Sequence, residues 1–181
     1  MIAMNKLKEE YTNIVSDILN DEHFVILQND FHHGTTKYNH LVKVSKLSFV
    51  ISKVLKLKIE ETTKAALLHD FFYGERTLKE ENSYLRHPHT AALNARKYFN
   101  TNDLETSIIE THMYHHVLLK KILPFVNKNE SINITQGKPK TKEAWVVSIS
   151  DLFVSVLEST LFLKYKFNIA FISLISIIIN K

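Results

Sequence analysis

The sequence contains no cysteine and very little glycine or proline, three of each among 181 residues. The absence of cysteine excludes disulfides, thiolate metal ligands and a cysteine nucleophile. Because glycine and proline are scarce, the chain has few residues suited to turns, which argues against a sandwich or barrel with many turns. We therefore expect an all-α fold, a helical bundle joined by short connections.

The chain also lacks an obvious targeting or membrane-spanning segment. Residues Met1 to Glu10 show no apolar core followed by a small-residue cleavage site, so we expect a cytoplasmic protein. The apolar run Phe167 to Ile179 falls short of the ~18 residues expected of a spanning helix, and we expect no transmembrane span. This run predicts a buried or dimer-forming terminal segment, with an interfacial membrane anchor as the open alternative. Its many β-branched residues leave helix and strand both open.

The net charge of +4 is modest, and the lysines are spread along the chain instead of forming one run. This pattern argues against a nucleic acid duplex as the partner and fits a small anionic ligand. The length and the 45% hydrophobic content suit one domain with a substantial core. We expect a single domain over residues 1–181, with its core at about 33–158 and an apolar C-terminal extension at 159–181.

The apolar periodicity and the capping residues predict the order of the helices. Thr36 is expected to cap a long helix, Pro88 to open another, and Asp103 to cap the one after it. The expected helices cover about 5–19, 21–28 (a short helix or turn), 36–56, 60–71, 89–99, a segment after 103, and 141–163.

Six residues of metal-ligand type lie mostly where these helices would otherwise carry an apolar side chain. His40 lies one turn before Val44, Asp70 follows an apolar helical run, and Asp151 lies within another. Buried carboxylates are costly without a counter-charge, and a cation would supply one. Imidazole and carboxylate together suit Fe, Mn, Co, Ni or Zn. The predicted metal ligands are His40, His69, Asp70, His87, His112 and Asp151, with His115 and His116 ranked below His112.

The order His, His-Asp, His, His, Asp on successive helices resembles the HD-domain superfamily of metal-dependent phosphohydrolases, over roughly His33 to Glu158. The resemblance implies that the first metal ion is held by His40, His69, Asp70 and Asp151. Asp70 would bridge to a second ion held by His87 and His112. The arrangement is similar to bacterial hydrolases that split diadenosine tetraphosphate symmetrically and to uncharacterised HD proteins of low-GC bacteria.

Two departures from the family pattern concern the substrate. Many HD hydrolases have a lysine shortly after the dipeptide, whereas here Phe71 to Gly74 follow and the first cation is Arg76. The residues after Asp151 also lack the acidic-proline signature of the diadenosine hydrolases. The sequence therefore supports the metal site better than it supports any particular substrate.

The resemblance implies two divalent ions, Fe, Mn or another transition metal, and hydrolysis of a phosphoester or phosphoanhydride of a nucleotide-like substrate by a metal-bridged hydroxide. Besides Asp70, the catalytic candidates are Arg76, as a phosphate clamp, and His33 and His115, which would protonate the leaving oxygen. Further candidate clamps are Lys43, Arg86 and Arg96. Two alternatives stay open: a mixed-valent di-iron oxygenase, and a non-catalytic helical binding module stabilised by metal.

Overall fold

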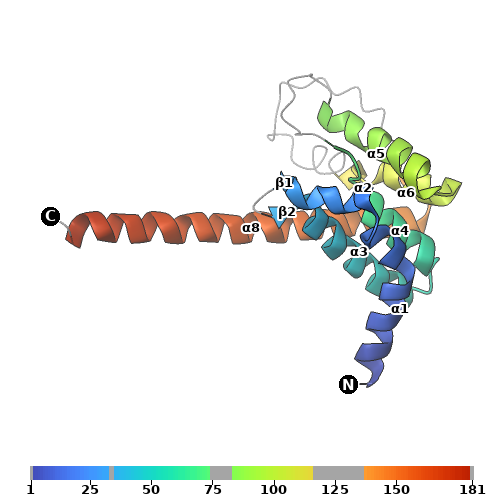
Figure 1. Ribbon diagram of the computed structural model, residues 1–181, viewed down its shortest axis with the longest axis horizontal. Helices are drawn as coiled ribbons and strands as arrows, with labels where there is room; N and C mark the ends of the chain where they lie inside the picture. Colours follow the sequence, from blue (N-terminus) through green and yellow to red (C-terminus); the bar gives the residue numbers. More distant parts are fainter. Residues whose placement is uncertain (1, 33–34, 74–82, 116–136, 180–181) are drawn as a thin grey trace.

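The fold is a bundle of helices, to which the described residues add a short antiparallel pair of strands (Figure 1). The computed structural model describes residues 2–32, 35–73, 83–115 and 137–179. The prediction of an all-α fold is confirmed. The elements are α1 (Ile2–Leu19), α2 (Glu22–Val25), the 3-10 helix η1 (Ile26–Asn29), β1 (Phe31–His32), β2 (Thr35–Thr36), α3 (Lys37–Val54), α4 (Ile59–Leu68), α5 (Ser83–Phe99), α6 (Asp103–Thr111) and α8 (Lys142–Ile179).

Helix α4 lies at the centre of the bundle, in contact with α1, α3, α5, α6 and α8. Its residues Ala65 to Leu68 are completely buried. The two alanines let neighbouring helices approach closely, and burial of each leucine contributes about 1.5–3 kcal/mol. Because α4 ends at His69, the His-Asp dipeptide lies inside the core instead of in a solvated loop.

Helix α3 begins where its capping residue predicts. The Thr36 side chain accepts a hydrogen bond from the backbone N–H of Asn39 at 3.2 Å. Such a bond satisfies one of the N–H groups that a helix N-terminus leaves without a partner. The cap fixes the helix register, and His40 consequently lies on the buried face of α3.

The N-cap of α6 is Asn102, so the prediction that Asp103 caps this helix was wrong. The Asn102 side chain accepts from the backbone N–H of Glu105 at 2.9 Å. The Glu105 carboxylate accepts from the backbone N–H of Asn102 at 2.7 Å. This reciprocal capping box satisfies two N–H groups at once, and Asp103 is the first helical residue.

Pro88 lies inside α5, whereas the sequence predicted that it opens this helix. The helix begins at Ser83, which places Pro88 in its second turn. Since the first four N–H groups of a helix have no intrahelical partner, a proline this early removes only a bond next to the helix end. His87 is therefore a helical residue and not part of a loop before the helix.

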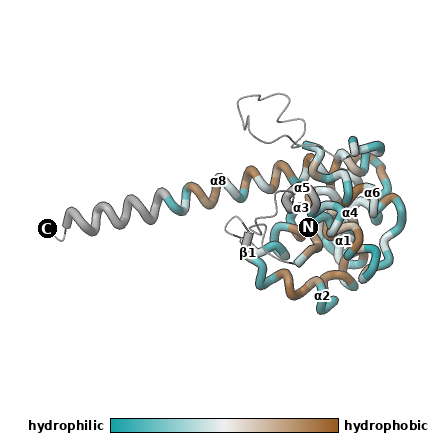
Figure 2. The backbone as a smooth tube through the Cα atoms, turned by 90° about the horizontal axis from the view of Figure 1, so that it is seen from above, coloured by the Kyte–Doolittle hydropathy of each residue, from teal (hydrophilic) through white to brown (hydrophobic). Residues whose placement is uncertain are grey.

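Helix α8 runs to Ile179, well beyond the predicted end near Leu163. The terminal segment 167–179, for which the sequence left helix and strand both open, is helical. No glycine or proline interrupts residues 142–179, so nothing in the sequence ends the helix earlier. Figure 1 shows the C-terminal part of α8 extending away from the bundle, and Figure 2 shows the same course for the coloured part of this helix.

Candidate metal centre

The structure brings all six predicted metal ligands together in the core, and each is buried. His69 and His112 terminate α4 and α6 as their C-cap residues. The ligand-type residues thus come from five separate places in the bundle: His40 on α3, His69 and Asp70 after α4, His87 on α5, His112 after α6, and Asp151 on α8.

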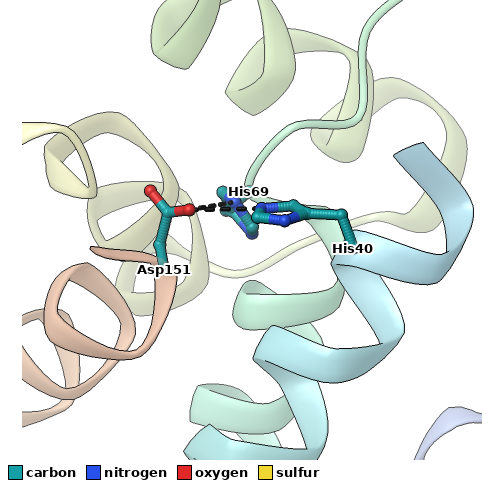
Figure 3. Close-up of side chains that lie close together, drawn as sticks. All are labelled: His40, His69 and Asp151. Atoms are coloured by element: carbon teal, nitrogen blue, oxygen red, sulfur yellow. Dashed lines mark hydrogen bonds and ion pairs between the residues drawn. The ribbon is translucent and has the colours of Figure 1, made fainter. Parts of the chain in front are cut away.

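One half of this centre is built around Asp151. Its Oδ1 atom lies 3.2 Å from Nε2 of His40 and 3.6 Å from Nε2 of His69. Figure 3 shows both imidazole rings directed at this carboxylate from α3 and from the end of α4. The ligand atoms of these three buried residues all lie within 4.8 Å of one another, close enough to hold one metal ion.

The other half is built around Asp70. Its Oδ1 atom lies 3.0 Å from Nε2 of His87 and 3.4 Å from Nε2 of His112. The same two Nε2 atoms lie 3.2 Å apart, a separation that requires a proton or a cation between the two nitrogens. His69, Asp70 and His112 form a second group whose ligand atoms lie within 4.8 Å of one another. His69 belongs to both groups and joins the two halves.

Backbone carbonyls three residues earlier orient three of the histidines. Nδ1–H of His69 donates to the Ala66 carbonyl at 2.8 Å, and Nδ1–H of His112 donates to the Ile109 carbonyl at 2.7 Å. His115 makes the same contact with the carbonyl of His112 at 3.0 Å. A proton on Nδ1 leaves Nε2 with its lone pair, which is the tautomer that binds metals.

Glu158 is a site residue that the sequence analysis missed. Its carboxylate accepts from Nδ1 of His40 at 2.8 Å and from Nζ of Lys43 at 2.9 Å. A carboxylate on the outer nitrogen of a metal-binding histidine fixes the ring and increases its basicity. The available signal was spacing, since Glu158 lies seven residues, about two helical turns, after Asp151.

The electrostatics of the two halves differ. Burial alone would lower the pKa of His40, but its hydrogen bonds to Asp151 and Glu158 prevail and raise this pKa to about 10. For Asp151, burial is likewise outweighed, and His40 and His69 hold its pKa well below the usual value. In the other half, burial dominates and lowers the pKa of His112 to about 4. His112 is therefore neutral at pH 7, the form of imidazole that binds a metal, whereas His40 would release a proton when an ion binds.

His115 lies at the edge of the same centre. Its Nε2 atom is 4.0 Å from Oδ2 of Asp151, and its Nδ1 atom is also 3.2 Å from the hydroxyl of Ser148. Burial lowers the pKa of His115. A neutral ring that donates from Nδ1 presents an unprotonated Nε2 to the centre, an arrangement suited to a base or an additional ligand.

The remaining candidates lie elsewhere. His33, Arg76 and His116 fall outside the described residues, as does the side chain of Arg86. Lys43 is engaged by Glu158, and exposed Arg96 pairs with Asp103 at 2.8 Å. His89, which the sequence did not favour as a ligand, is exposed beside Glu110.

A second residue missed from the sequence is Lys37, a buried cation one turn before His40. Its Nζ atom lies 2.5 Å from Oδ2 of Asp30 and donates to the Phe72 carbonyl at 2.9 Å. The same Nζ atom lies 3.7 Å from the centroid of the Phe72 ring. The Phe72 ring in turn lies 5.3 Å, centroid to centroid, from that of His87. Lys37 therefore holds the backbone that follows Asp70 against α3.

The donor set fits divalent transition metals. Imidazole nitrogen and carboxylate oxygen are the ligands that Fe, Mn and Zn share, and the sequence has no cysteine to supply a thiolate. Nε2 of His69 is completely buried and makes no hydrogen bond to any described residue. A buried nitrogen with its lone pair toward a carboxylate is explained by a cation between them.

Comparisons with known proteins agree with this geometry. Searches of curated proteins and of solved structures found no match. The model of the HD domain family matches residues 38–154, which include all six predicted ligands and cover more than half of the chain. Proteins with this domain are generally metal-dependent hydrolases. The chain therefore belongs to the HD domain family.

Proposed function

We propose that this protein is a binuclear metal-dependent phosphohydrolase that acts on a phosphoester or phosphoanhydride of a nucleotide-like molecule. The observation that carries the proposal is the convergence of four Nε2 atoms, from His40, His69, His87 and His112, on two buried carboxylates. A lone structural histidine needs no such set of partners.

Two ions are favoured over one by the division of the ligands. His40, His69 and Asp151 would hold the first ion and His87 and His112 the second, with Asp70, which follows His69 in the chain, as the bridging ligand of both. Three or four protein ligands for each ion leave coordination positions open for water and substrate, as in other catalytic metal sites.

When bound, two divalent ions supply electrostatic stabilisation for phosphoryl oxygens and lower the pKa of a coordinated water. The chain itself orients the ligands: the carbonyls of Ala66 and Ile109 fix the rings of His69 and His112, and Glu158 fixes His40. Apolar burial around the site excludes bulk water, which strengthens every charge interaction within it. His115 can accept a proton at Nε2, beside Asp151.

The test is phosphate release from a panel of nucleotides, dinucleoside polyphosphates and simple phosphoesters, with Mn(II) or Fe(II) added. Wild type should release phosphate or a nucleotide product. Asp70→Asn keeps the shape of the side chain but removes a ligand charge, and should lower turnover by at least 100-fold. Asp103→Asn is the matched control, because Asp103 lies on the exposed start of α6 and should leave turnover unchanged.

Equal turnover by wild type and Asp70→Asn would refute the proposal. Oxygen consumption by the iron-loaded protein, with no phosphate product from any member of the panel, would instead establish the oxygenase alternative. Bound metal that stabilises the fold, with neither oxygen uptake nor phosphate release, would indicate a binding module.

A further inference from the structure

Helix α8 leaves the core after Glu158, which is the last buried side chain among residues 142–166. Before this point α8 packs on α3, α4 and α6. Beyond it, Leu161, Leu163 and Tyr165 are 65%, 53% and 62% exposed. Figure 1 shows this part of the helix, residues 159–179, leaving the bundle, with no other described element beside it. We call it the C-terminal arm.

The arm is too apolar for a helix that stays in water. Of the thirteen residues 167–179, ten are hydrophobic, three are Asn or Ser, and none is charged. The preceding segment of α8, Lys142–Lys166, is also long and hydrophobic enough to cross a membrane, with a mean hydropathy of 1.7. That segment includes the half of α8 that is buried in the bundle, so its hydrophobicity is partly that of a core helix, whereas the arm lies beyond the last contact with the core.

The distribution of apolar residues distinguishes a bilayer from a second copy of the chain. A two-helix coiled coil buries one stripe, the a and d positions of a heptad. With Phe167 and Leu174 at position a, the outward positions of such a pair would still include Ile169, Ile172, Ile175 and Ile179. A helix that is hydrophobic nearly all round requires an apolar environment on every side, and lipid provides one.

The charges lie where a membrane surface would require them. Lys164, Tyr165 and Lys166 directly precede the uncharged run, and basic and aromatic residues are typical of the headgroup region. Side chains of a helix tilt toward its N-terminus, so the two lysines can extend back toward the headgroups. The run 167–179 would be about 20 Å long at 1.5 Å per residue, deep enough to pass well into the hydrocarbon core.

We propose that the C-terminal arm inserts into an anionic lipid bilayer, with Lys164, Tyr165 and Lys166 at the headgroups. The metal centre would then lie close to the membrane, because Asp151 precedes Lys164 on the same helix by thirteen residues, or about 20 Å. The inference is independent of the reaction that the metal centre performs.

The test is flotation of the full-length protein with vesicles of phosphatidylcholine, with and without about 30% phosphatidylserine, a probe composition chosen for its negative surface. Wild type should float with both and bind the anionic vesicles more tightly. Ile172→Asp/Ile175→Asp places two charges in the apolar run and should weaken partitioning at least 100-fold. Val50→Asp/Val54→Asp is the matched control: it adds the same charge on the exposed face of α3 and should float like wild type.

A second variant separates the contribution of charge. Lys164→Gln/Lys166→Gln should bind anionic vesicles about thirtyfold more weakly, at about 1 kcal/mol for each lysine, and should change little on neutral vesicles. The proposal is overturned if wild type remains with the unbound protein. It is also overturned if wild type is a dimer in solution that Ile172→Asp/Ile175→Asp converts to a monomer, with no flotation of either protein. That result would assign the arm to a second copy of the chain.

Discussion

The buried carboxylates around the metal centre contact different nitrogen atoms of the histidines and therefore have different roles. Asp70 and Asp151 face Nε2 atoms, where a metal ion would bind. Glu158 faces the outer nitrogen of His40 and is itself paired with Lys43. Burial alone would raise the pKa of Glu158, but the hydrogen bonds from His40 and Lys43 outweigh burial and lower this pKa. The Glu158 carboxylate therefore remains charged in the protein. Glu158 is thus a positioning residue for His40.

Glu158→Gln tests this role. Glutamine can keep the hydrogen bond to Nδ1 of His40 but not the negative charge, so we expect Mn(II) affinity to fall about 10- to 100-fold, the usual effect of losing such a partner. Calorimetric titration of chelator-treated protein would measure it. Glu110→Gln, on the exposed face of α6, is the control and should bind like wild type. An unchanged affinity in Glu158→Gln would remove Glu158 from the site.

Glu105 predicts a pH dependence of stability that is unrelated to the metal centre. Burial raises its pKa from the ordinary 4.5, against the opposing effects of the Asn102 backbone N–H and Lys64. The folded state therefore keeps this proton to a higher pH than the unfolded state does. Its contribution to stability is favourable at low pH and is lost as the pH rises through the folded pKa.

Glu105→Gln removes this titration and keeps an acceptor for the capping box. The free energy of unfolding of wild type minus that of Glu105→Gln should decrease as the pH rises from 4 to 7. Urea denaturation at a series of pH values measures this difference, with Glu110→Gln as the control for the loss of one charge from α6. A difference that grows with pH would contradict the prediction.

At the scale of an element, α6 depends on its N-terminal cap because it has only nine residues. A helix this short is marginal on its own, so its unsatisfied N–H groups matter. Asn102→Ala removes the acceptor for the N–H of Glu105 and should lower the free energy of unfolding by about 1 kcal/mol. Urea denaturation is the measurement. Asp103→Ala separates the two candidate caps: if it costs more than Asn102→Ala, the capping residue is misassigned.

The sequence predicted the order and type of the long helices but not where all of them end. Thr36 was found because a single capping residue stands before a clear apolar stripe. Asn102 and Asp103 are both good N-caps, and the spacing of the capping box was the overlooked signal: Glu105 lies three residues after Asn102, whereas Thr106 lies three residues after Asp103. The prediction that Pro88 opens α5 was wrong because proline also occurs in an early turn of a helix and not only at its first position.

The metal ligands could be predicted from the sequence where a polar residue interrupts the apolar stripe of a helix. A histidine or aspartate on a buried stripe is conspicuous, which identified His40 and Asp151. Lys37 and Glu158 were missed because a lysine or glutamate on a long helix ordinarily lies in solvent. Their burial arises where α3 packs against the segment after α4 and against α8. Residues that support a metal ligand from behind can be identified only once the packing of the helices is known.

At the scale of the whole molecule, α8 connects the metal centre in the bundle with the apolar C-terminal arm outside it. Its first half supplies Asp151 and Glu158 to the centre of the bundle, and its second half is the C-terminal arm. The packing of His40 against Asp151 and Glu158 attaches α8 to α3 through charged groups in the interior. Buried charges of this kind stabilise the fold only when they are mutually compensated, so the integrity of the bundle should depend on the metal centre.

Metal removal tests this dependence. Without cations, His87 and His112 face each other at 3.2 Å and two carboxylates remain in the core, so the metal-free protein should be less stable. An ion present at 100 times its Kd contributes about 2.7 kcal/mol. For a chain of this size we expect chelation to lower Tm by about 5–10 °C, measured by circular dichroism. Restoring Mn(II) should reverse the shift.

The control is Asp70→Asn, which lacks a ligand charge and should respond much less to chelation or to added Mn(II). An unchanged Tm in protein shown by elemental analysis to have lost its metal would mean that the buried groups compensate one another without an ion.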